Sequence, residues 1–413
     1  MNDAKSDLVR SLTGRGYHYQ ATDLAGLDAR AAKEPLTGYI GFDLTAPSLH
    51  VGSLVQIMML RRMQQAGHTP IILLGGATTK VGDPSGKDAS RPLLTPETIQ
   101  SHTDGILQPF AKLLDLDRAV VVNNDDWLAG YGYLDFLREY GTHFTINRMM
   151  AFDSVKLRLE REQPLTFLEF NYMLLQAVDF LELNRRQGCT LQLGGADQWG
   201  NIVNGVELCR RVDGVEVFGF TTPLITTASG AKMGKTADGA VWLNEDRLSA
   251  YEYWQFWRNT EDGDVGRFLK LFTDLPLDEI ERFEALQGAE INDAKIALAD
   301  AATEMMHGEA AASEARATSA ATFAGGGAGA ALPTLEVSAS ALGAGELQIT
   351  ALLTDIGLVA SRGEAKRKMK EGAVKLNEAA VNDAQAALGV GDILDGVAKL
   401  SVGKKKHALI KPV

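Results

Sequence analysis

Residues 39–76, YIGFDLTAPSLHVGSLVQIMMLRRMQQAGHTPIILLGG, contain two short apolar runs on either side of a longer helix-like segment. The first run, residues 39–42, is typical of a strand and leads into a turn at residues 46–48. Apolar residues then recur at helical spacing over residues 54–60, and residues 71–74 form a second strand-like run before two glycines. A strand, a helix and a strand in this order predict a βαβ unit of a parallel sheet.

Alternating strand and helix signals continue past this unit. Residues 97–114 have helical spacing and residues 119–122 are strand-like. We therefore expect an α/β domain that extends to about residue 230. After about residue 245 helical signals dominate, and an Ala/Gly/Ser-rich stretch over residues 309–332 indicates a helix that runs into a flexible linker.

The composition is that of an ordinary globular protein, with one asymmetry of charge. Hydrophobic residues make up 45% of the chain, and no apolar run approaches the ~20 residues that a membrane span needs. The formal net charge is −12. Residues 351–413, however, contain 11 Lys and Arg against 7 Asp and Glu, a local net charge of +4, so the rest of the chain carries −16. A basic tail on an acidic body predicts that a polyanion binds at local patches.

The two cysteines, Cys189 and Cys209, are too far apart in the sequence for a compact metal motif and do not form a disulfide framework. Residues 1–5 lack the positive-then-apolar layout of a secretory signal. We therefore expect a protein of the reducing cytoplasm, with no membrane segment and no dedicated metal site.

A first candidate phosphate-binding motif is His50-Val51-Gly52-Ser53, where the first expected strand has turned into the first expected helix. Ligands of parallel sheets bind at such strand ends, and helix N-termini attract phosphate. Gly52 would let a nucleotide approach the backbone, and His50 could donate a hydrogen bond to a phosphate. Taken alone, the tetrapeptide is more simply interpreted as a turn with a capping role.

A second candidate motif is Lys232-Met233-Gly234-Lys235-Thr236, which follows a stretch of small residues. Two lysines three positions apart can clamp a triphosphate, and their charge can follow the negative charge that builds on departing pyrophosphate. The spacing is not that of a P-loop. On its own, such a run is usually a solvated surface loop.

Together, in this order on an α/β domain, the two motifs resemble the HIGH and KMSKS signatures of class I aminoacyl-tRNA synthetases. Ser53 departs from the commonest signature, which has a second histidine there, and Gly234 and Thr236 stand in place of serines. Further segments resemble the bacterial tyrosyl-tRNA synthetases over essentially the whole chain, namely YIGFD at 39–43, GDPSGK at 82–87, YMLLQAVD at 172–179 and QLGGADQWGN at 192–201.

The resemblance implies a reaction and a domain order. The reaction is activation of L-tyrosine by ATP, with release of pyrophosphate, and transfer of the tyrosyl group to the 3′-terminal ribose of tRNA(Tyr). The implied domains are a Rossmann-type catalytic domain with a connective insertion (1–230), a KMSKS-like loop with an α-helical anticodon-side domain (231–325), a linker (326–347), and a small α+β RNA-binding module similar to the S4 domain (348–413).

A tyrosine site must satisfy a phenolic hydroxyl, an apolar ring, an ammonium and a carboxylate. Tyr172, Gln176 and Asp179 are four and three positions apart, so one helix face presents all three. By resemblance, Asp179 and Tyr39 bond the phenolic hydroxyl, and phenylalanine would leave these buried polar groups unpaired. The complete tyrosine set that the resemblance implies is Tyr39, Asp83, Tyr172, Gln176, Asp179 and Gln192.

Adenylate formation needs no side-chain nucleophile, because the tyrosine carboxylate attacks the α-phosphorus itself. Catalysis then consists of positioning and charge stabilisation. Mg²⁺ is expected to enter with ATP. The resemblance implies for catalysis His50, Lys87, Lys232, Lys235 and Thr236, and for ATP binding Gly41, Asp43, His50, Gly52, Ser53, Gly194, Asp197, Gln198 and Lys235.

Basic residues gather near the C-terminus, in SRGEAKRKMK at 361–370 followed by GAVKLN at 372–377. This pattern resembles an S4 module, whose basic helix lies along RNA phosphates. The implied RNA contacts are Arg362, Lys366, Arg367 and Lys368, and at the acceptor arm Arg210 and Arg211, with Arg148, Lys156 and Arg158 as further basic positions. A homodimer is also implied, and the apolar stretch 127–144 is a candidate interface.

Two other interpretations stay open at this point. A tryptophan-activating relative would share the fold, although the pair of Tyr39 and Asp179 suits a phenol better than an indole. A catalytically retired synthetase that acts as an RNA-binding protein would have no use for His50, Lys232 and Lys235.

Overall fold

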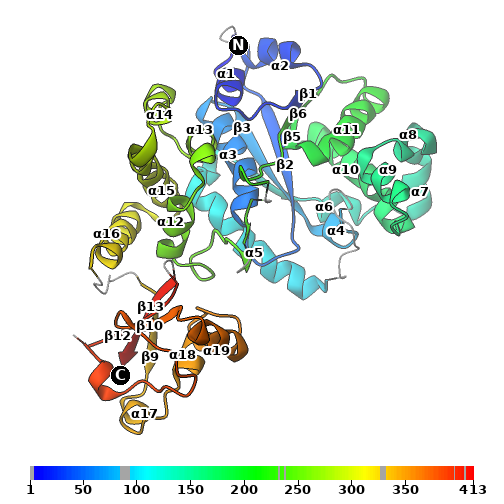
Figure 1. The fold of residues 1–413 in the computed structure, drawn as a ribbon. Helices are drawn as coiled ribbons and strands as arrows, with labels where there is room; N and C mark the ends of the chain where they lie inside the picture. The colour runs from blue at the N-terminus through cyan, green and yellow to red at the C-terminus, as the bar shows by residue number, and fades with distance from the viewer. Residues whose placement is uncertain are drawn as a thin grey trace. The chain divides into compact units, whose positions relative to one another are not determined.

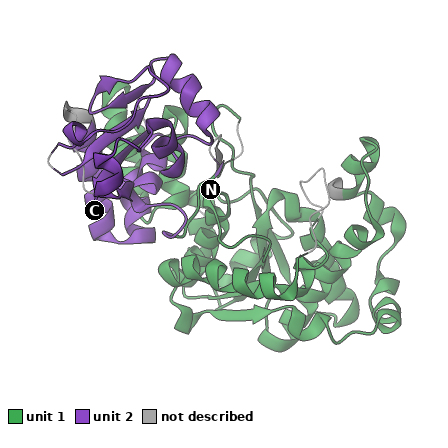
Figure 2. Cartoon of the chain, turned by 90° about the horizontal axis from the view of Figure 1, so that it is seen from below, with its two compact units in different colours: residues 1–236, 240–244, 260–298 green, residues 237–239, 245–259, 299–413 purple. Residues whose placement is uncertain are grey.

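The chain, represented by a computed structural model, is described over residues 4–83, 94–230, 233–236, 239–325, 332–394, 396–403 and 406–413. Figure 1 labels its elements. Two compact units, coloured separately in Figure 2, consist of residues 1–236, 240–244 and 260–298, and of residues 237–239, 245–259 and 299–413. The helical domain expected over residues 231–325 is therefore divided between the two units.

The first unit is built on a six-stranded sheet in the order β1-β6-β5-β2-β3-β4. All neighbouring strands are parallel except β1, which is antiparallel to β6. The predicted βαβ unit is confirmed as β2, α3 (Val51–Gln65) and β3. The strands are β1 (Gln20–Ala21), β2 (Thr37–Asp43), β3 (Thr69–Gly75), β4 (Val120–Asn123), β5 (Leu191–Gly195) and β6 (Phe218–Thr222).

Alternate residues of the central strands point to opposite faces of this sheet. Tyr39, Ile71 and Leu73 belong to one core cluster with residues of α10 (Phe167–Gln187) and α11 (Trp199–Val212). On the other face, a Cβ at Gly38 would lie 2.9 Å from the end of the Met63 side chain of α3. The strand order reverses between β2 and β5, because the chain continues from β2 to β3 and β4 on one side and from β5 to β6 on the other. Parallel sheets bind ligands in the crevice at the carboxyl ends of the strands that flank such a point.

The helices of the first unit follow from local sequence signals. α10 begins with a capping box between Thr166 and Glu169 and ends at Gly188, whose φ of 61° is left-handed. α15 (Ile291–His307) crosses the division between the units. The other helices are α1 (Asp7–Gly14), α2 (Leu24–Ala31), α4 (Gly76–Thr79), α5 (Pro96–Leu113), α6 (Asp125–Leu128), α7 (Tyr133–Glu139), α8 (Ile146–Met150), α9 (Asp153–Glu160), α13 (Val265–Phe272) and α14 (Leu277–Glu284).

An ionic cluster ties α3 to the segment after α13. Asp274 pairs with Arg61 and with Arg62, whose Nη1 lies 2.5 Å from Oδ1. Arg62 is 3% exposed and also donates to the carbonyl of Thr273. Burial alone would raise the pKa of Asp274, but hydrogen bonds and charge from the two arginines lower it to about 2. Residues 260–298 therefore pack with the sheet unit and do not form a separate domain.

The C-terminal part of the second unit is a five-stranded sheet in the order β11-β10-β12-β13-β9. The structure corrects the linker expected over residues 326–347, because residues 334–343 form β9 and α17 of this module. β9 pairs in parallel with β13, and Val337 and Leu342 are buried in the module's core. The elements are β9 (Thr334–Val337), α17 (Ala339–Gly343), α18 (Ile349–Asp355), α19 (Arg362–Lys370), β10 (Val374–Leu376), β11 (Ala379–Ala380), β12 (Ala398–Val402) and β13 (Lys406–Pro412).

The second unit also contains α12 (Ala250–Arg258) and α16 (Glu309–Gly325), which pack against each other. No helix in the described ranges is long and apolar enough to cross a bilayer. Cys189 and Cys209 are buried free thiols, and burial raises the pKa of both.

Candidate active site

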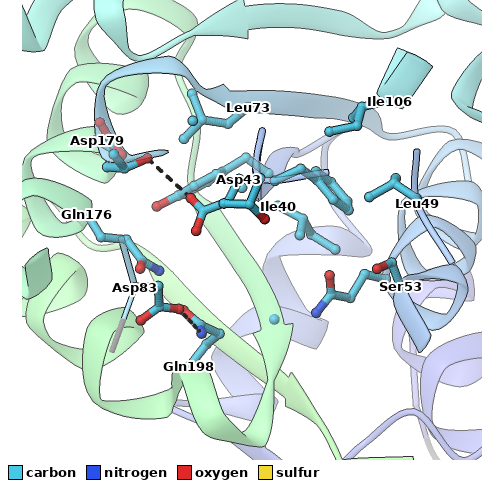
Figure 3. A pocket seen from close by; sticks show the side chains of 18 of the residues that line it. Ile40, Asp43, Leu49, Ser53, Leu73, Asp83, Ile106, Gln176, Asp179 and Gln198 are labelled. Atoms are coloured by element: carbon cyan, nitrogen blue, oxygen red, sulfur yellow. Dashed lines mark hydrogen bonds between the residues drawn. The ribbon is translucent and has the colours of Figure 1, made fainter. Parts of the chain in front are cut away.

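A cavity of about 290 Å³ opens at the carboxyl ends of β2 and β5. In Figure 3, Asp179 and Gln176 lie on one side of it and Leu49 and Ser53 on the other, with Asp43 between them. The predicted residues that line this cavity are Tyr39, Gly41, Asp43, His50, Ser53, Asp83, Tyr172, Gln176, Asp179, Gln192, Gly194, Asp197 and Gln198. Residues that the sequence analysis missed also line it, among them Thr45, Ser48, Gln56 and Asn124.

Asp179 is the most deeply placed acid of the cavity, with 2% of its surface exposed. Its Oδ2 accepts a hydrogen bond of 3.0 Å from Asn124, and its Oδ1 accepts one of 2.8 Å from the indole of Trp127. Burial raises the pKa of Asp179 to about 7, although these two hydrogen bonds oppose the shift. Asp179 is therefore a buried acceptor in the cavity wall.

Tyr39 supplies a donor beside this acceptor. Its side chain is 1% exposed, and its hydroxyl has no hydrogen-bond partner within the described part of the chain. Burial and the charge of Asp179 raise the pKa of Tyr39 well above its usual value, so the hydroxyl keeps its proton. An unpaired buried hydroxyl costs about 1–3 kcal/mol. A buried donor and a buried acceptor that line one cavity fit a ligand hydroxyl, which can satisfy both.

Several further polar side chains line the same cavity and are hydrogen-bonded to one another. Asp83 accepts a hydrogen bond of 2.8 Å from Gln198, the dashed contact in the lower part of Figure 3. The hydroxyl of Tyr172 donates to Asp43 over 3.4 Å. Besides Asp179, the carboxylates of Asp43, Asp83 and Asp197 line the cavity, and they favour a positively charged ligand group.

The opposite side of the cavity contains the first motif. His50 is the N-cap residue of α3, and its Nδ1 accepts a hydrogen bond of 3.0 Å from the backbone N–H of Gly52. Because Nδ1 is the acceptor, a neutral His50 carries its proton on Nε2 and can donate it. This donor and the N-terminus of a 15-residue helix make an anion-binding corner.

The second motif lies directly against the first. A Cβ at Gly234 would lie 2.7 Å from the backbone N of Gly52, and a Cβ at Gly52 would lie 2.9 Å from the carbonyl oxygen of Met233. Gly234 also has φ +85°, which favours glycine. The glycine that replaces the serine of the general signature is therefore required here by close backbone approach.

Four of the predicted phosphate ligands lie wholly or partly outside the described residues. Lys87 and Lys232 lie outside the described residues. Lys235 and Thr236 form the short strand β7, which pairs with β8 (Gly239–Ala240), but their side chains are likewise outside the description.

The predicted RNA-binding residues occupy two surfaces. Arg210 and Arg211 of α11 both pair with Glu207, at 2.7 and 2.6 Å. On α19, Ala365 and Met369 are buried, so Arg362, Lys366 and Arg367 lie on the exposed side, while Lys368 is about one-third exposed. Arg362 and Lys366 line a hollow of about 400 Å³. Arg158, in contrast, does not face RNA, because it is 3% exposed and pairs with Glu169 at 2.9 Å.

Family comparison defines the class first. Residues 31–324 match the family described as tRNA synthetases class I (W and Y), and residues 330–410 match the Tyrosine--tRNA ligase SYY-like C-terminal domain. The first match covers more than half of the chain. The chain therefore belongs to the class I tRNA synthetases, and ATP is a substrate of its reaction.

Relatives define the branch within that class. The Tyrosine--tRNA ligase of Caulobacter sp. (strain K31) is 62% identical over 413 residues, covering 99% of this chain and 98% of its own. That of Rhodospirillum rubrum is 60% identical, covering 100% and 99%. A C-terminally truncated mitochondrial tyrosyl-tRNA synthetase of Aspergillus nidulans is 31% identical with a TM-score of 0.69, covering 77% of this chain and 94% of its own. The activity of the chain is that of a tyrosine--tRNA ligase, and neither alternative interpretation is favoured.

Tyrosine capture is expected to weaken as the pH falls through about 7. The raised pKa of Asp179 means that its carboxyl is protonated below that pH, and if Asp179 is the acceptor for the phenol of tyrosine, the neutral carboxyl binds that phenol more weakly. The other titratable groups around it are Tyr39, Asp43 and Glu182. In ATP–pyrophosphate exchange, kcat/KM for tyrosine should fall about tenfold per pH unit below the pKa, while KM for ATP stays level. A flat tyrosine profile between about pH 6 and 8 would contradict this assignment.

Proposed function

We propose that the cavity at the carboxyl ends of β2 and β5 binds L-tyrosine and ATP side by side and forms tyrosyl-adenylate there. The observation that carries the proposal is the pair of Tyr39 and Asp179, an unpaired buried donor and a buried acceptor in one cavity. Tyr39 donates to the phenolic oxygen, and the phenolic proton is donated to Asp179. Phenylalanine has no hydroxyl for either group and leaves both without a partner.

The remaining polar groups orient the reacting end of tyrosine. Asp83, Tyr172 and Gln176 hold the ammonium, with Gln192 nearby, which leaves the tyrosine carboxylate free to attack the α-phosphorus of ATP. As the bond to pyrophosphate breaks, His50 and the N-terminus of α3 stabilise the developing charge. Lys87, Lys232, Lys235 and Thr236 are proposed for the same phosphates. Ribose and adenine lie along Gly41, Asp43, Gly52, Ser53, Gly194, Asp197 and Gln198.

Pyrophosphate exchange with each of the twenty amino acids, without tRNA, tests this assignment. We expect kcat/KM for tyrosine to exceed that for every other amino acid by a wide margin, with only slow exchange for phenylalanine, because only tyrosine satisfies both phenol-binding groups. Exchange with phenylalanine at a comparable kcat/KM would contradict the phenol assignment, and preferential exchange with tryptophan would assign the cavity to an indole.

Mg²⁺ is proposed to arrive as the complex with ATP and to leave with pyrophosphate. Within the described residues, no group of three His, Cys, Asp or Glu side chains could hold a metal ion. A cytoplasmic location is proposed because ATP and tRNA are both found there and because both thiols are unpaired.

The exposed side of α19 is proposed to bind tRNA(Tyr) through its phosphates, with Arg210 and Arg211 at the acceptor arm. Replacing both Arg362 and Lys366 with Glu should lower kcat/KM for tRNA charging by at least about tenfold and leave pyrophosphate exchange unchanged, because only tRNA meets this surface. Lys411→Glu is the matched control, since Lys411 is exposed on β13 of the same module. Equal losses in both variants would argue for a general charge effect.

A homodimer is proposed to form through an apolar surface on α7–α10. Within the stretch expected at residues 127–144, Trp127, Phe136 and Tyr140 are buried, whereas Tyr133 and Leu134 are exposed. The exposed apolar side chains of the wider region are Tyr133, Leu134, Ile146, Met150, Leu157, Leu159, Phe167 and Leu168, with 44–73% exposure. Apolar side chains gathered in this way mark interaction surfaces.

Phe167→Asp should convert the dimer to a monomer in sedimentation velocity, because a charge at a position 66% exposed would have to be buried on association. Val390→Asp is the matched control, since Val390 is 65% exposed on the C-terminal module. A variant dimer of undiminished stability would show that another surface associates.

A further inference from the structure

We infer that Arg186, a residue of the protein surface, positions the phenol-binding carboxylate of Asp179 by holding the indole of Trp127 in place. Arg186 lies at the last turn of α10, seven residues beyond Asp179 on the same helix. The inference deepens the proposed function and rests on it, because Asp179 must be the group that receives the phenol.

The two hydrogen-bond donors of Asp179 are supported in different ways. Asn124 is fixed by its own hydrogen bonds, since its Oδ1 accepts from the N–H of Ala77 at 2.8 Å and its Nδ2 donates to Thr78 at 3.0 Å as well as to Asp179. The indole of Trp127 has a single N–H, which donates to Asp179, so no second hydrogen bond fixes this ring. The orientation of the indole therefore depends on what packs against its ring.

Arg186 provides a contact with that ring. Its guanidinium carbon lies 5.5 Å from the centroid of the Trp127 ring, within the range of cation–π interactions. Trp127 belongs to α6, a helix of only four residues, so its own element gives it little support. A cation packed on the ring restricts its tilt, and the direction of the N–H that reaches Asp179 is restricted with it.

Glu182 fixes Arg186 in this position. Its Oε2 accepts a hydrogen bond of 2.7 Å from Nε of Arg186, and its side chain is 7% exposed. Its other oxygen accepts from the hydroxyl of Tyr131 at 3.2 Å and from Arg185 at 3.3 Å. Arg186 is itself 49% exposed. Its removal therefore leaves Glu182 with two partners, and the fold should survive the change.

Arg186→Gln tests the inference in pyrophosphate exchange with tyrosine and with phenylalanine. We expect kcat/KM for tyrosine to fall about fivefold to tenfold, the size of a cation–π contact, mainly through KM for tyrosine. Phenylalanine and ATP constants should not change, so the selectivity ratio falls by the same factor. Arg186→Lys, which keeps a cation, should restore most of the ratio. Arg30→Gln, which breaks an exposed pair with Glu34, is the control and should have no effect.

A double variant shows whether the effect passes through the indole. In a Trp127→Phe background, Arg186→Gln should change the selectivity ratio no further, because Phe has no N–H to orient. An unchanged selectivity ratio in Arg186→Gln would overturn the inference. So would a double variant in which Arg186→Gln lowers the ratio by the same factor as it does in the wild-type background. Asp179→Asn in the same assay distinguishes a failure of the proposed function from a failure of this inference. An unchanged selectivity ratio in Asp179→Asn would overturn the proposed function. A collapsed ratio in Asp179→Asn together with an unchanged ratio in Arg186→Gln would overturn the positioning role alone.

Discussion

Asp179→Asn should lower kcat/KM for tyrosine in pyrophosphate exchange by about 100- to 1000-fold, the usual size of a lost hydrogen bond to a buried charge. The substituted amide has one acceptor oxygen in place of two carboxylate oxygens, and Asn124 and Trp127 already compete for them. The NH₂ group of the substituted amide would also face a hydrogen-bond donor, and two donors cannot bond to each other. Phenylalanine, which has no hydroxyl to lose, should be activated as before, so discrimination between the two amino acids collapses.

Loss of folding does not explain such a result, because the stability effect is expected to be small. Burial raises the pKa of Asp179 to about 7, above its usual value of 3.8, so the folded protein binds this proton more tightly than the unfolded chain does. Stability from this group is complete below about pH 4 and is lost as the pH rises towards 7. Removing the charge at neutral pH therefore offsets the lost hydrogen bond, and the thermal midpoint should hardly move.

Asp125→Asn is the matched control for this experiment. Asp125 lies next to Asn124, is partly exposed and pairs with Lys80 at 2.7 Å, but does not line the cavity. It should leave both amino acids unaffected. Retained selectivity in the Asp179 variant would show that the phenol is held elsewhere, whereas a loss in both variants would point to disturbance of α6.

The sequence predicted the part of the fold that depends on short-range signals. Periodicity over residues 39–76 was enough to predict β2, α3 and β3, and the helical spacing of Tyr172, Gln176 and Asp179 does bring all three to one cavity. The parallel register then brings the ends of β2 and β5 together. Residues that are far apart in the sequence, such as Asp43 and Asp197, meet there for that reason.

The features that the sequence did not predict depend on contacts between residues far apart in the chain. Asn124 and Trp127 precede Asp179 by more than fifty residues, and neither carries a local signal for a donor to a buried acid. The sequence favours a linker where β9 lies, because a four-residue strand after a Gly-rich stretch has almost no period of its own. Pairing with β13 makes this segment a strand. The sequence gives no sign that Arg158 is buried against Glu169, because that burial depends on tertiary packing.

Asp274→Ala should destabilise the first unit by about 2–3 kcal/mol, less than the cost of breaking a fully buried ion pair, because the Asp274 side chain is 32% exposed. The change leaves Arg61 and Arg62 side by side without their shared carboxylate, and Arg62 is 3% exposed. Denaturant unfolding measures the effect. Asp278→Ala is the matched control, because Asp278 pairs with Arg282 at 3.9 Å with both side chains at least 75% exposed. Such a pair contributes about 0–1 kcal/mol.

The same carboxylate gives the wild-type protein an acid-sensitive contact. The pKa of Asp274 is about 2 in the folded chain against a usual value of 3.8, so its contribution is complete above about pH 4 and is lost as the pH falls towards 2. A shift of this size corresponds to about 2 kcal/mol. Between about pH 4 and 2 the wild-type protein should therefore lose stability more steeply than the Asp274→Ala variant, which has no such proton to bind. Parallel curves would mean that other carboxylates govern acid unfolding and that the arginine pair contributes little.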